Sequence, residues 1–209
     1  MKNIRRRKPS TRSWIGDRIS HTVPIPRVKV AAALYLLSAF VPMVFQGEEW
    51  AASTPFLYFT GHEDRELGRA VAQGRRSEFA SFGWKADDIP DPQDLATFER
   101  SKLAWRELRR HPHAEMHDWY RSLIHLRRAT PDLADGRLDL VKVRADDDAG
   151  TIVVERGPIT IVANLGRGEQ KVELGPDRGS TALLISDNDV EVGSRGVTLP
   201  PDTLAVLGP

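Results

Sequence analysis

The stretch that decides the fold is Pro42-Met43-Val44-Phe45-Gln46-Gly47-Glu48-Glu49-Trp50. An apolar run of strand length ends at Gly47, and two carboxylates and a tryptophan follow it at once. The continuous apolar character of Val41 to Phe45 predicts a short buried strand, because a parallel strand covered on both faces needs apolar residues at every position. In an α/β barrel, the loop that follows such a strand lies at the active-site end.

Glu48, Glu49 and Trp50 are therefore the candidate binding residues. Acids accept hydrogen bonds from sugar hydroxyls and aromatic faces stack on sugar rings, so this composition indicates a carbohydrate cleft. A retaining pair of catalytic carboxyls needs a separation of about 5 Å across the substrate, whereas neighbours in an extended segment point to opposite sides. We assign these residues to substrate binding and no catalytic role: one acid binds a hydroxyl or an arginine, and the other supports the loop.

Helical patterns surround this stretch. The spacing of apolar residues predicts helices over 26–39, 66–79 and 112–129. Asp94 is a plausible N-cap for a further helix from Leu95 onward. In the helix over 112–129, an apolar stripe that includes Trp119 predicts a buried face, with Arg121, Arg127 and Arg128 facing outward.

After residue 130 the pattern changes to short alternating or apolar runs separated by turn residues. We expect strands at 138–143, 151–155, 159–163, 171–174, 182–185 and 203–207. Such spacing predicts an antiparallel β-sandwich. Asp146-Asp147-Asp148 could hold calcium, but its place between two strands, before Ala149-Gly150, is most simply a hairpin turn.

Composition limits the function classes. The 209 residues are 40% hydrophobic and 28% charged, with a formal net charge of +1, so we expect neither nucleic acid nor a membrane as partner. The absence of cysteine excludes disulfides and thiolate metal sites, and it fits a cytoplasmic location. Residues 1–13 form a basic run, which as a solvated segment would be a disordered tail.

No pattern calls for a cofactor or a metal. His113 and His117 are four residues apart on a predicted helix, but the HExxH arrangement is absent. Trp84, Trp105 and Trp119 could stack on sugars, although Trp119 belongs to the apolar stripe. We therefore expect no cofactor and no metal site.

The stretch around Gly47 also resembles the eighth barrel strand of the α-amylase-type glycoside hydrolases. The following Ala51-Ala52-Ser53-Thr54-Pro55-Phe56 narrows the resemblance to the branch of malto-oligosyltrehalose trehalohydrolases. Further matching segments are Gly16 to Thr22, Gly74 to Phe79, Pro90 to Gln93 and Phe98 to Trp105.

The resemblance implies an architecture that is α/β followed by all-β. Residues 14–130 would be the C-terminal end of a (β/α)8 barrel, incomplete, with a long loop on the active-site side. Residues 131–209 would be an antiparallel β-sandwich domain. A complete barrel takes about 250 residues, so it cannot fit in this chain.

The resemblance further implies hydrolysis of the α-1,4 bond next to the terminal trehalose of maltooligosyl trehalose, which releases trehalose. The family uses three carboxylates, and none of them can be carried over to this chain. Where the third would stand, residues 4–13 contain no acid. The sequence therefore changes from unrelated to family-like between Ser13 and Trp14, and a frameshift, a truncated gene or a mis-called start would explain this change. The fragment alone would be inactive.

Two other function classes remain open. The chain could be a non-catalytic module that binds α-glucan or maltooligosyl trehalose, or one that completes a separately encoded N-terminal barrel portion. Alternatively, the basic run of residues 1–13 could bind nucleic acid, which the near-neutral charge of the chain disfavours.

Overall fold

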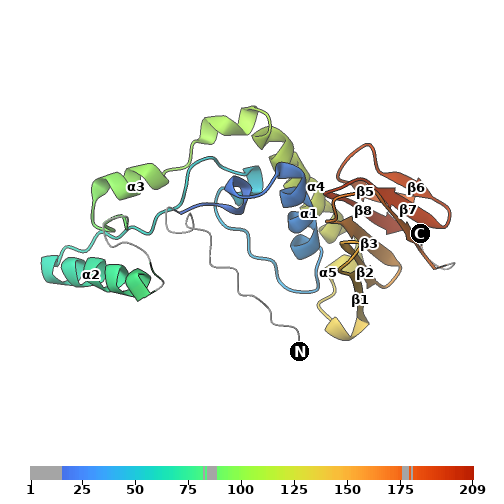
Figure 1. Ribbon diagram of the computed structural model, residues 1–209, viewed down its shortest axis with the longest axis horizontal. Coiled ribbons are helices and arrows are strands. Elements are labelled where there is room, and N and C mark those ends of the chain that lie inside the picture. Colours follow the sequence, from blue (N-terminus) through green and yellow to red (C-terminus); the bar gives the residue numbers. More distant parts are fainter. Residues whose placement is uncertain (1–15, 82, 84–88, 176–178, 180) are drawn as a thin grey trace. The chain divides into compact units, whose positions relative to one another are not determined.

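The computed structural model describes residues 16–81, 83, 89–175, 179 and 181–209. The basic run of residues 1–13 and Trp84 lie outside the described residues. Contacts divide the chain into two units, one of residues 1–22 and 52–107 and one of residues 23–51 and 108–209 (Figure 1). This division differs from the predicted boundary near residue 130, because two helices before that position pack with the strands after it.

The first unit contains η2 (Ile19–His21), α2 (Arg65–Ser81) and α3 (Leu95–Ser101). Asp94 caps α3 as predicted, since its Oδ1 accepts a hydrogen bond from Ala96 N at 2.9 Å. The rings of Phe59 and Phe98 meet edge to face with centroids 5.0 Å apart. The 3-10 helix η5 (Trp105–Arg109) follows α3 along the chain.

In its described residues, the second unit contains five helical elements. They are α1 (Ile25–Leu36), η3 (Glu48–Trp50), α4 (His113–Ala129), α5 (Pro131–Ala134) and η6 (Leu138–Leu140). The predicted helices over 26–39, 66–79 and 112–129 are confirmed as α1, α2 and α4, with ends shifted by up to three residues. Pro131 ends α4 as a proline does, because it cannot continue the ladder of helical hydrogen bonds, and it begins α5.

Within the described residues of this unit, eight strands form two antiparallel sheets. The larger sheet has the order β1-β2-β3-β8-β5, and the smaller has the order β4-β7-β6. The strands are β1 (Val141–Asp146), β2 (Thr151–Arg156), β3 (Ile159–Asn164), β4 (Gln170–Glu173), β5 (Thr181–Ile185), β6 (Glu191–Gly193), β7 (Gly196–Leu199) and β8 (Thr203–Gly208). The predicted antiparallel sandwich is confirmed, and Asp146 Oδ1 caps the hairpin turn by accepting from Asp148 N and Ala149 N.

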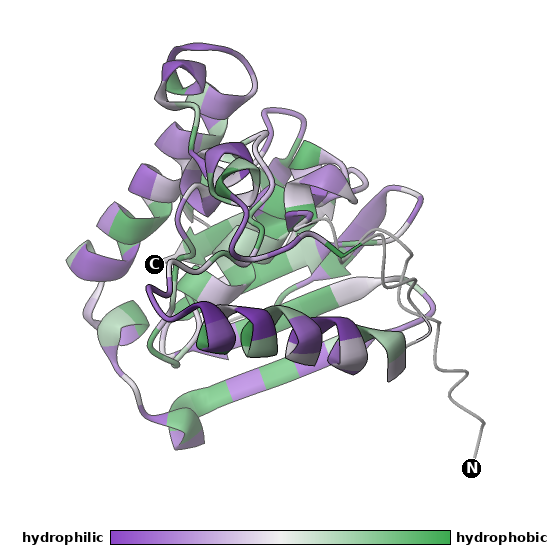
Figure 2. Cartoon of the chain, turned by 90° about the vertical axis from the view of Figure 1, so that its left-hand side faces the viewer, coloured by the Kyte–Doolittle hydropathy of each residue, from purple (hydrophilic) through white to green (hydrophobic). Residues whose placement is uncertain are grey.

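The larger sheet is buried on both faces at its centre. All residues of β3 and β8 are buried, and successive side chains of a strand point to opposite faces. Ile161 and Val206 face a core shared with α1 and α4, whereas Val162 and Ala205 face a core shared with the smaller sheet. The unit therefore has three layers, and apolar residues dominate many of its strands (Figure 2).

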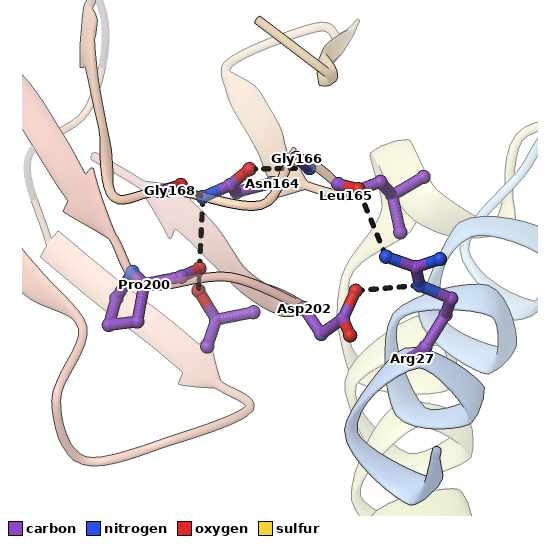
Figure 3. Close-up of polar contacts among 8 residues, drawn as sticks. Arg27, Asn164, Leu165, Gly166, Gly168, Pro200 and Asp202 are labelled. Carbon is purple, nitrogen blue, oxygen red and sulfur yellow. Dashed lines mark hydrogen bonds and ion pairs between the residues drawn. The ribbon is translucent and has the colours of Figure 1, made fainter. Parts of the chain in front are cut away.

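Polar contacts fasten α1 to the loops at one end of the sheet (Figure 3). Arg27 Nε donates to Asp202 Oδ1 at 2.7 Å, and Arg27 Nη2 donates to the carbonyl of Leu165 at 3.1 Å. Asn164 Nδ2 donates to the carbonyls of Gly168 and Pro200, at 2.9 and 3.0 Å. The two bonds of Arg27 fix α1 to the loops beside β3 and β8, and those of Asn164 hold these loops to each other.

The prediction of a buried strand at Val41 to Phe45 is wrong. This segment forms no strand, and Val41 and Met43 are 95% and 82% exposed. A strand needs a neighbour for its ladder of hydrogen bonds, and among the described residues none pairs with this segment. The apolar residues are present as expected, but no partner strand covers them.

Candidate functional site

The candidate site is centred on η3. Gly47 takes a positive φ of 80° immediately before it and Ala51 a φ of 53° immediately after it, so the chain turns sharply at both ends. Glycine adopts this backbone conformation without steric cost. The expectation that Glu48 and Glu49 lie in an extended segment is therefore wrong. They begin a 3-10 turn, in which Ala51 N donates to the carbonyl of Glu48 at 3.0 Å.

Glu48 is bound by two tyrosines from different helices. The hydroxyls of Tyr35 (α1) and Tyr120 (α4) each lie 3.1 Å from Glu48 Oε1 and 3.0 Å from one another. Phe45 N donates to Glu48 Oε2 at 3.0 Å. The carboxylate thus joins α1, α4 and its own loop.

The tyrosine pair is protonated over the whole ordinary pH range. Burial, followed by contact with Glu48, raises the pKa of Tyr35 to about 12, against an opposing contribution from Tyr120. The pKa of Tyr120 is also raised, chiefly by burial and then by its bond with Tyr35. Each hydroxyl has only one hydrogen to donate. When one tyrosine donates to the other, the second hydroxyl still needs an acceptor, and Glu48 supplies it.

Glu49 and Trp50 differ from Glu48 in their surroundings. Glu49 Oε2 is buried and accepts no hydrogen bond within the described residues. Trp50 is only 1% exposed, and its carbonyl accepts a hydrogen bond from His113 Nδ1 at 2.9 Å. The ring of Trp50 is therefore closed to a ligand in this conformation, while the free oxygen of Glu49 retains its capacity to accept a hydrogen bond.

Two arginines hold the chain that leads into the site. Arg127 donates to the carbonyls of Leu36, Ser38 and Phe40, at 2.5, 2.6 and 3.0 Å. The prediction that Arg127 faces outward is wrong, because the last carbonyls of α1 need donors and a nearby guanidinium satisfies them. Arg121 and Arg128 are exposed, as predicted.

Arg156 of β2 is the second of these arginines and is 3% exposed. It donates to the carbonyls of Leu37 and Leu133 at 2.7 and 3.0 Å, and to that of Asp135. Burial lowers the pKa of its guanidinium, with the charge of Arg127 adding to the effect. Sequence reasoning missed the contacts of both arginines, and the one available signal was the Glu155-Arg156 charge pair at the end of the otherwise apolar strand β2.

The remaining candidates from the sequence have structural roles or stay untested. Trp119 is 6% exposed and donates to the carbonyl of Lys29 at 3.0 Å, as expected for a core residue, whereas Trp105 is 64% exposed. Within the described ranges, no group of three or more His, Cys, Asp and Glu side chains could hold a metal ion. Every helix in those ranges is too short or too polar to cross a membrane.

Comparison with known proteins shows which enzymes this chain is similar to. The chain is 44% identical over 193 residues to the malto-oligosyltrehalose trehalohydrolase of Rhizobium sp. strain M-11, and 42% identical over 192 residues to that of Brevibacterium helvolum. Each alignment covers 92% of this chain and 32% of the relative. The chain matches a C-terminal portion of the malto-oligosyltrehalose trehalohydrolase family.

The trehalohydrolase resemblance extends to a more distant relative, and a domain model matches part of the chain. The enzyme of Saccharolobus solfataricus is 37% identical over 113 residues, which is 54% of this chain and 18% of that enzyme. A domain of unknown function, DUF3459, matches residues 136–206. This chain spans about a third of the length of the trehalohydrolases first named above.

Solved structures agree on the fold of this trehalohydrolase-like chain. A Salmonella typhimurium protein described as an alpha amylase superposes with a TM-score of 0.74 at 29% identity, covering 94% of this chain and 33% of that protein. The trehalulose synthase of Pseudomonas mesoacidophila MX-45 superposes with a TM-score of 0.58 at 17% identity, covering 88% and 38%. The second likeness concerns the fold alone.

Proposed function

We propose that this chain is the C-terminal part of a glycoside hydrolase that cleaves the α-1,4 bond next to the terminal trehalose of maltooligosyl trehalose, in the cytoplasm, and releases trehalose. The observation that carries the proposal is the 44% identity over 92% of the chain to a trehalohydrolase. The geometry around η3 supports a substrate-binding role for Glu48, Glu49 and Trp50, with no catalytic residue among them.

The three residues have different parts in this proposal. Glu49 is the direct contact: its Oε2 accepts no hydrogen bond within the described residues, and a sugar hydroxyl that reaches this buried atom when the turn opens would satisfy it. Glu48 positions the turn through its bonds with Tyr35 and Tyr120. Trp50 holds the turn from within the core, since its ring is buried.

We further propose that the chain alone is inactive and that it acts with an N-terminal barrel portion. The exposed apolar segment of residues 40–45 supports this proposal. Its side chains and backbone would gain a cover and a hydrogen-bonded ladder from a neighbouring strand. The partner would be the part of a trehalohydrolase that precedes the aligned region.

The test is trehalose release from maltooligosyl trehalose, measured by chromatography. We expect no release by the pure chain, and release when it is refolded together with the separately expressed upstream part of the Rhizobium enzyme. Glu49→Gln should then lower kcat/KM about tenfold or more, as the loss of one hydrogen bond from a charged acceptor implies. Robust turnover by the chain alone would overturn the claim of inactivity.

The alternative is a non-catalytic module that binds α-glucan. Retardation of the chain in a gel that contains amylopectin distinguishes the two functions. Retardation that Glu49→Gln abolishes, without complementation of activity, would favour the binding module. Absence of retardation at high glucan, together with restored trehalose release in the mixture, would favour the hydrolase.

A further inference from the structure

Helix α2 presents a row of guanidinium groups that the site around η3 does not use. Arg65, Arg69 and Arg76 are four and seven residues apart, which places them on one side of the helix. Together with Ala72 and Gln73, they line one wall of a pocket of about 610 Å³. A volume of this size lies within the range of small-molecule sites, and most of α2 is hydrophilic (Figure 2).

The opposite wall of this pocket is built from a fixed turn. Gln93 accepts hydrogen bonds from Thr60 Oγ1 and His62 N, at 3.0 and 3.2 Å, and donates to the carbonyl of His62 at 3.3 Å. Asp91 Oδ1 accepts from Gln93 N at 2.9 Å. The wall therefore keeps its shape without a ligand.

Gly68 sets the distance between the two walls. A Cβ at this position would lie 2.1 Å from Gln93 Nε2, which is far inside contact distance, so a larger residue would require the Gln93 side chain to move. Gly68 is buried although the helix around it is mostly exposed. The close approach holds the arginine row beside the turn at residues 91–93.

The charges in the pocket do not balance. Among the lining residues that the structure describes, Asp91 is the single carboxylate, and its Oδ2 lies 3.4 Å from Arg76 Nη2. Within the part of the chain that the structure describes, neither Arg65 nor Arg69 has a carboxylate within ion-pair distance. Two guanidinium groups thus remain available to an anion.

We propose that this pocket binds a phosphate-bearing small molecule through Arg65 and Arg69, with Asp91 orienting Arg76. A planar guanidinium matches the oxygens of a phosphate with two parallel hydrogen bonds, which a neutral sugar hydroxyl cannot exploit. Among the described lining residues there is no Phe, Tyr or Trp ring on which a sugar could stack, and the one aromatic ring is the imidazole of His62. The ligand chemistry is therefore that of a phosphate group, either free or on a sugar.

Isothermal titration of the full chain at low ionic strength tests this site with inorganic phosphate, glucose 6-phosphate and glucose as probes. We expect the phosphate-bearing probes to bind and glucose not to bind. Tighter binding of glucose 6-phosphate than of inorganic phosphate would identify a sugar phosphate as the ligand, and the reverse would identify the free anion. Each outcome supports the proposal.

Variants assign the binding to this pocket. Arg65→Gln with Arg69→Gln should weaken phosphate binding by on the order of a hundredfold, since two charge-assisted contacts are lost. Gln73→Glu adds a negative charge to the same wall without removing a guanidinium and should also weaken binding. Arg100→Gln on α3 removes an equal charge outside the pocket and should leave binding unchanged.

Three results would overturn the proposal. The first is no binding of either phosphate-bearing probe at concentrations on the order of 10 mM, where even a weak site would be occupied. The second is undiminished binding by both the double variant and Gln73→Glu, with unchanged thermal unfolding. The third is equal binding of glucose and glucose 6-phosphate.

Discussion

Glu48 and Glu49 are adjacent acids for which the structure predicts opposite effects on stability. Glu48→Gln should destabilise the chain. The amide oxygen can still accept from the hydroxyls of Tyr35 and Tyr120, but the amide NH2 then faces Phe45 N, and two donors oppose each other. Glu49→Gln changes a carboxylate oxygen that accepts no hydrogen bond within the described residues, so its loss removes no bond.

The magnitudes follow from these contacts. A hydrogen bond to a charged group contributes about 1.5–3 kcal/mol, and Glu48→Gln loses one such bond and weakens two more. We expect its unfolding free energy to fall by about 2–3 kcal/mol, which corresponds to a decrease in Tm of roughly 4–12 °C for a chain of this size. Glu49→Gln should lie within about 0.5 kcal/mol of the parent, or be more stable, because the carboxylate that it replaces has a buried oxygen with no hydrogen bond within the described residues.

Urea unfolding followed by circular dichroism and tryptophan fluorescence measures both variants. Tyr120→Phe in the Glu48→Gln background completes a double-mutant cycle, which isolates the interaction between these two side chains. Equal stability of the two glutamine variants would refute the reasoning, as would a coupling energy of zero between Glu48 and Tyr120.

Three further predictions rest on the same unit. Arg156→Met should lower the free energy of unfolding in urea by about 3 kcal/mol, because three backbone carbonyls lose their donor. The control Arg128→Met, at an exposed position, should be neutral, and equal effects of the two variants would contradict the role of the buried guanidinium. The pKa values of Tyr35 and Tyr120 are raised above the unfolded value of about 10. The stability that the pair contributes is therefore fully present below that pH and is lost as the pH rises through about 12, where Tyr35 ionises. A titration followed at 295 nm in which both tyrosines ionise near pH 10 without unfolding would contradict this prediction. Met43→Asp should leave the Tm of the chain unchanged, since the side chain is 82% exposed, but should abolish complementation by the upstream barrel portion. Trehalose release by a mixture that contains this variant would argue against that partner.

The sequence predicted best those elements whose signal is local. Helix α4 and strands β2, β3 and β8 have strong periodicity or continuous apolar runs, and they lie within a few residues of the predicted bounds. Strands β6 and β7 were missed, because they are three and four residues long and are separated only by a tight turn. Such short strands form because they pack on an apolar face of the larger sheet, and the local sequence pattern of the strands does not indicate that face.

The candidate site could be predicted only in part. Glu48, Glu49 and Trp50 were identified by their place after an apolar run, and they share a turn as adjacent residues must. The tyrosines that bind Glu48 were out of reach of sequence reasoning, since they lie 13 residues before it and 72 residues after it. The segment of residues 40–45 has the composition of a buried strand, but composition cannot supply the neighbouring strand that burial needs.

The two-sided burial of β3 and β8 bears on how such domains can be exchanged between proteins. The matched domain of unknown function covers residues 136–206 and so contains the larger sheet except for the last two residues of β8, but not the helices that close one of its faces. A recombination event that moved those residues alone would expose Ile161, Leu204 and Val206 to solvent. The heritable module is therefore larger than the recognisable sequence domain, and any successful transplant of the sandwich has to bring α1 and α4, or an equivalent pair of helices in the recipient, with it.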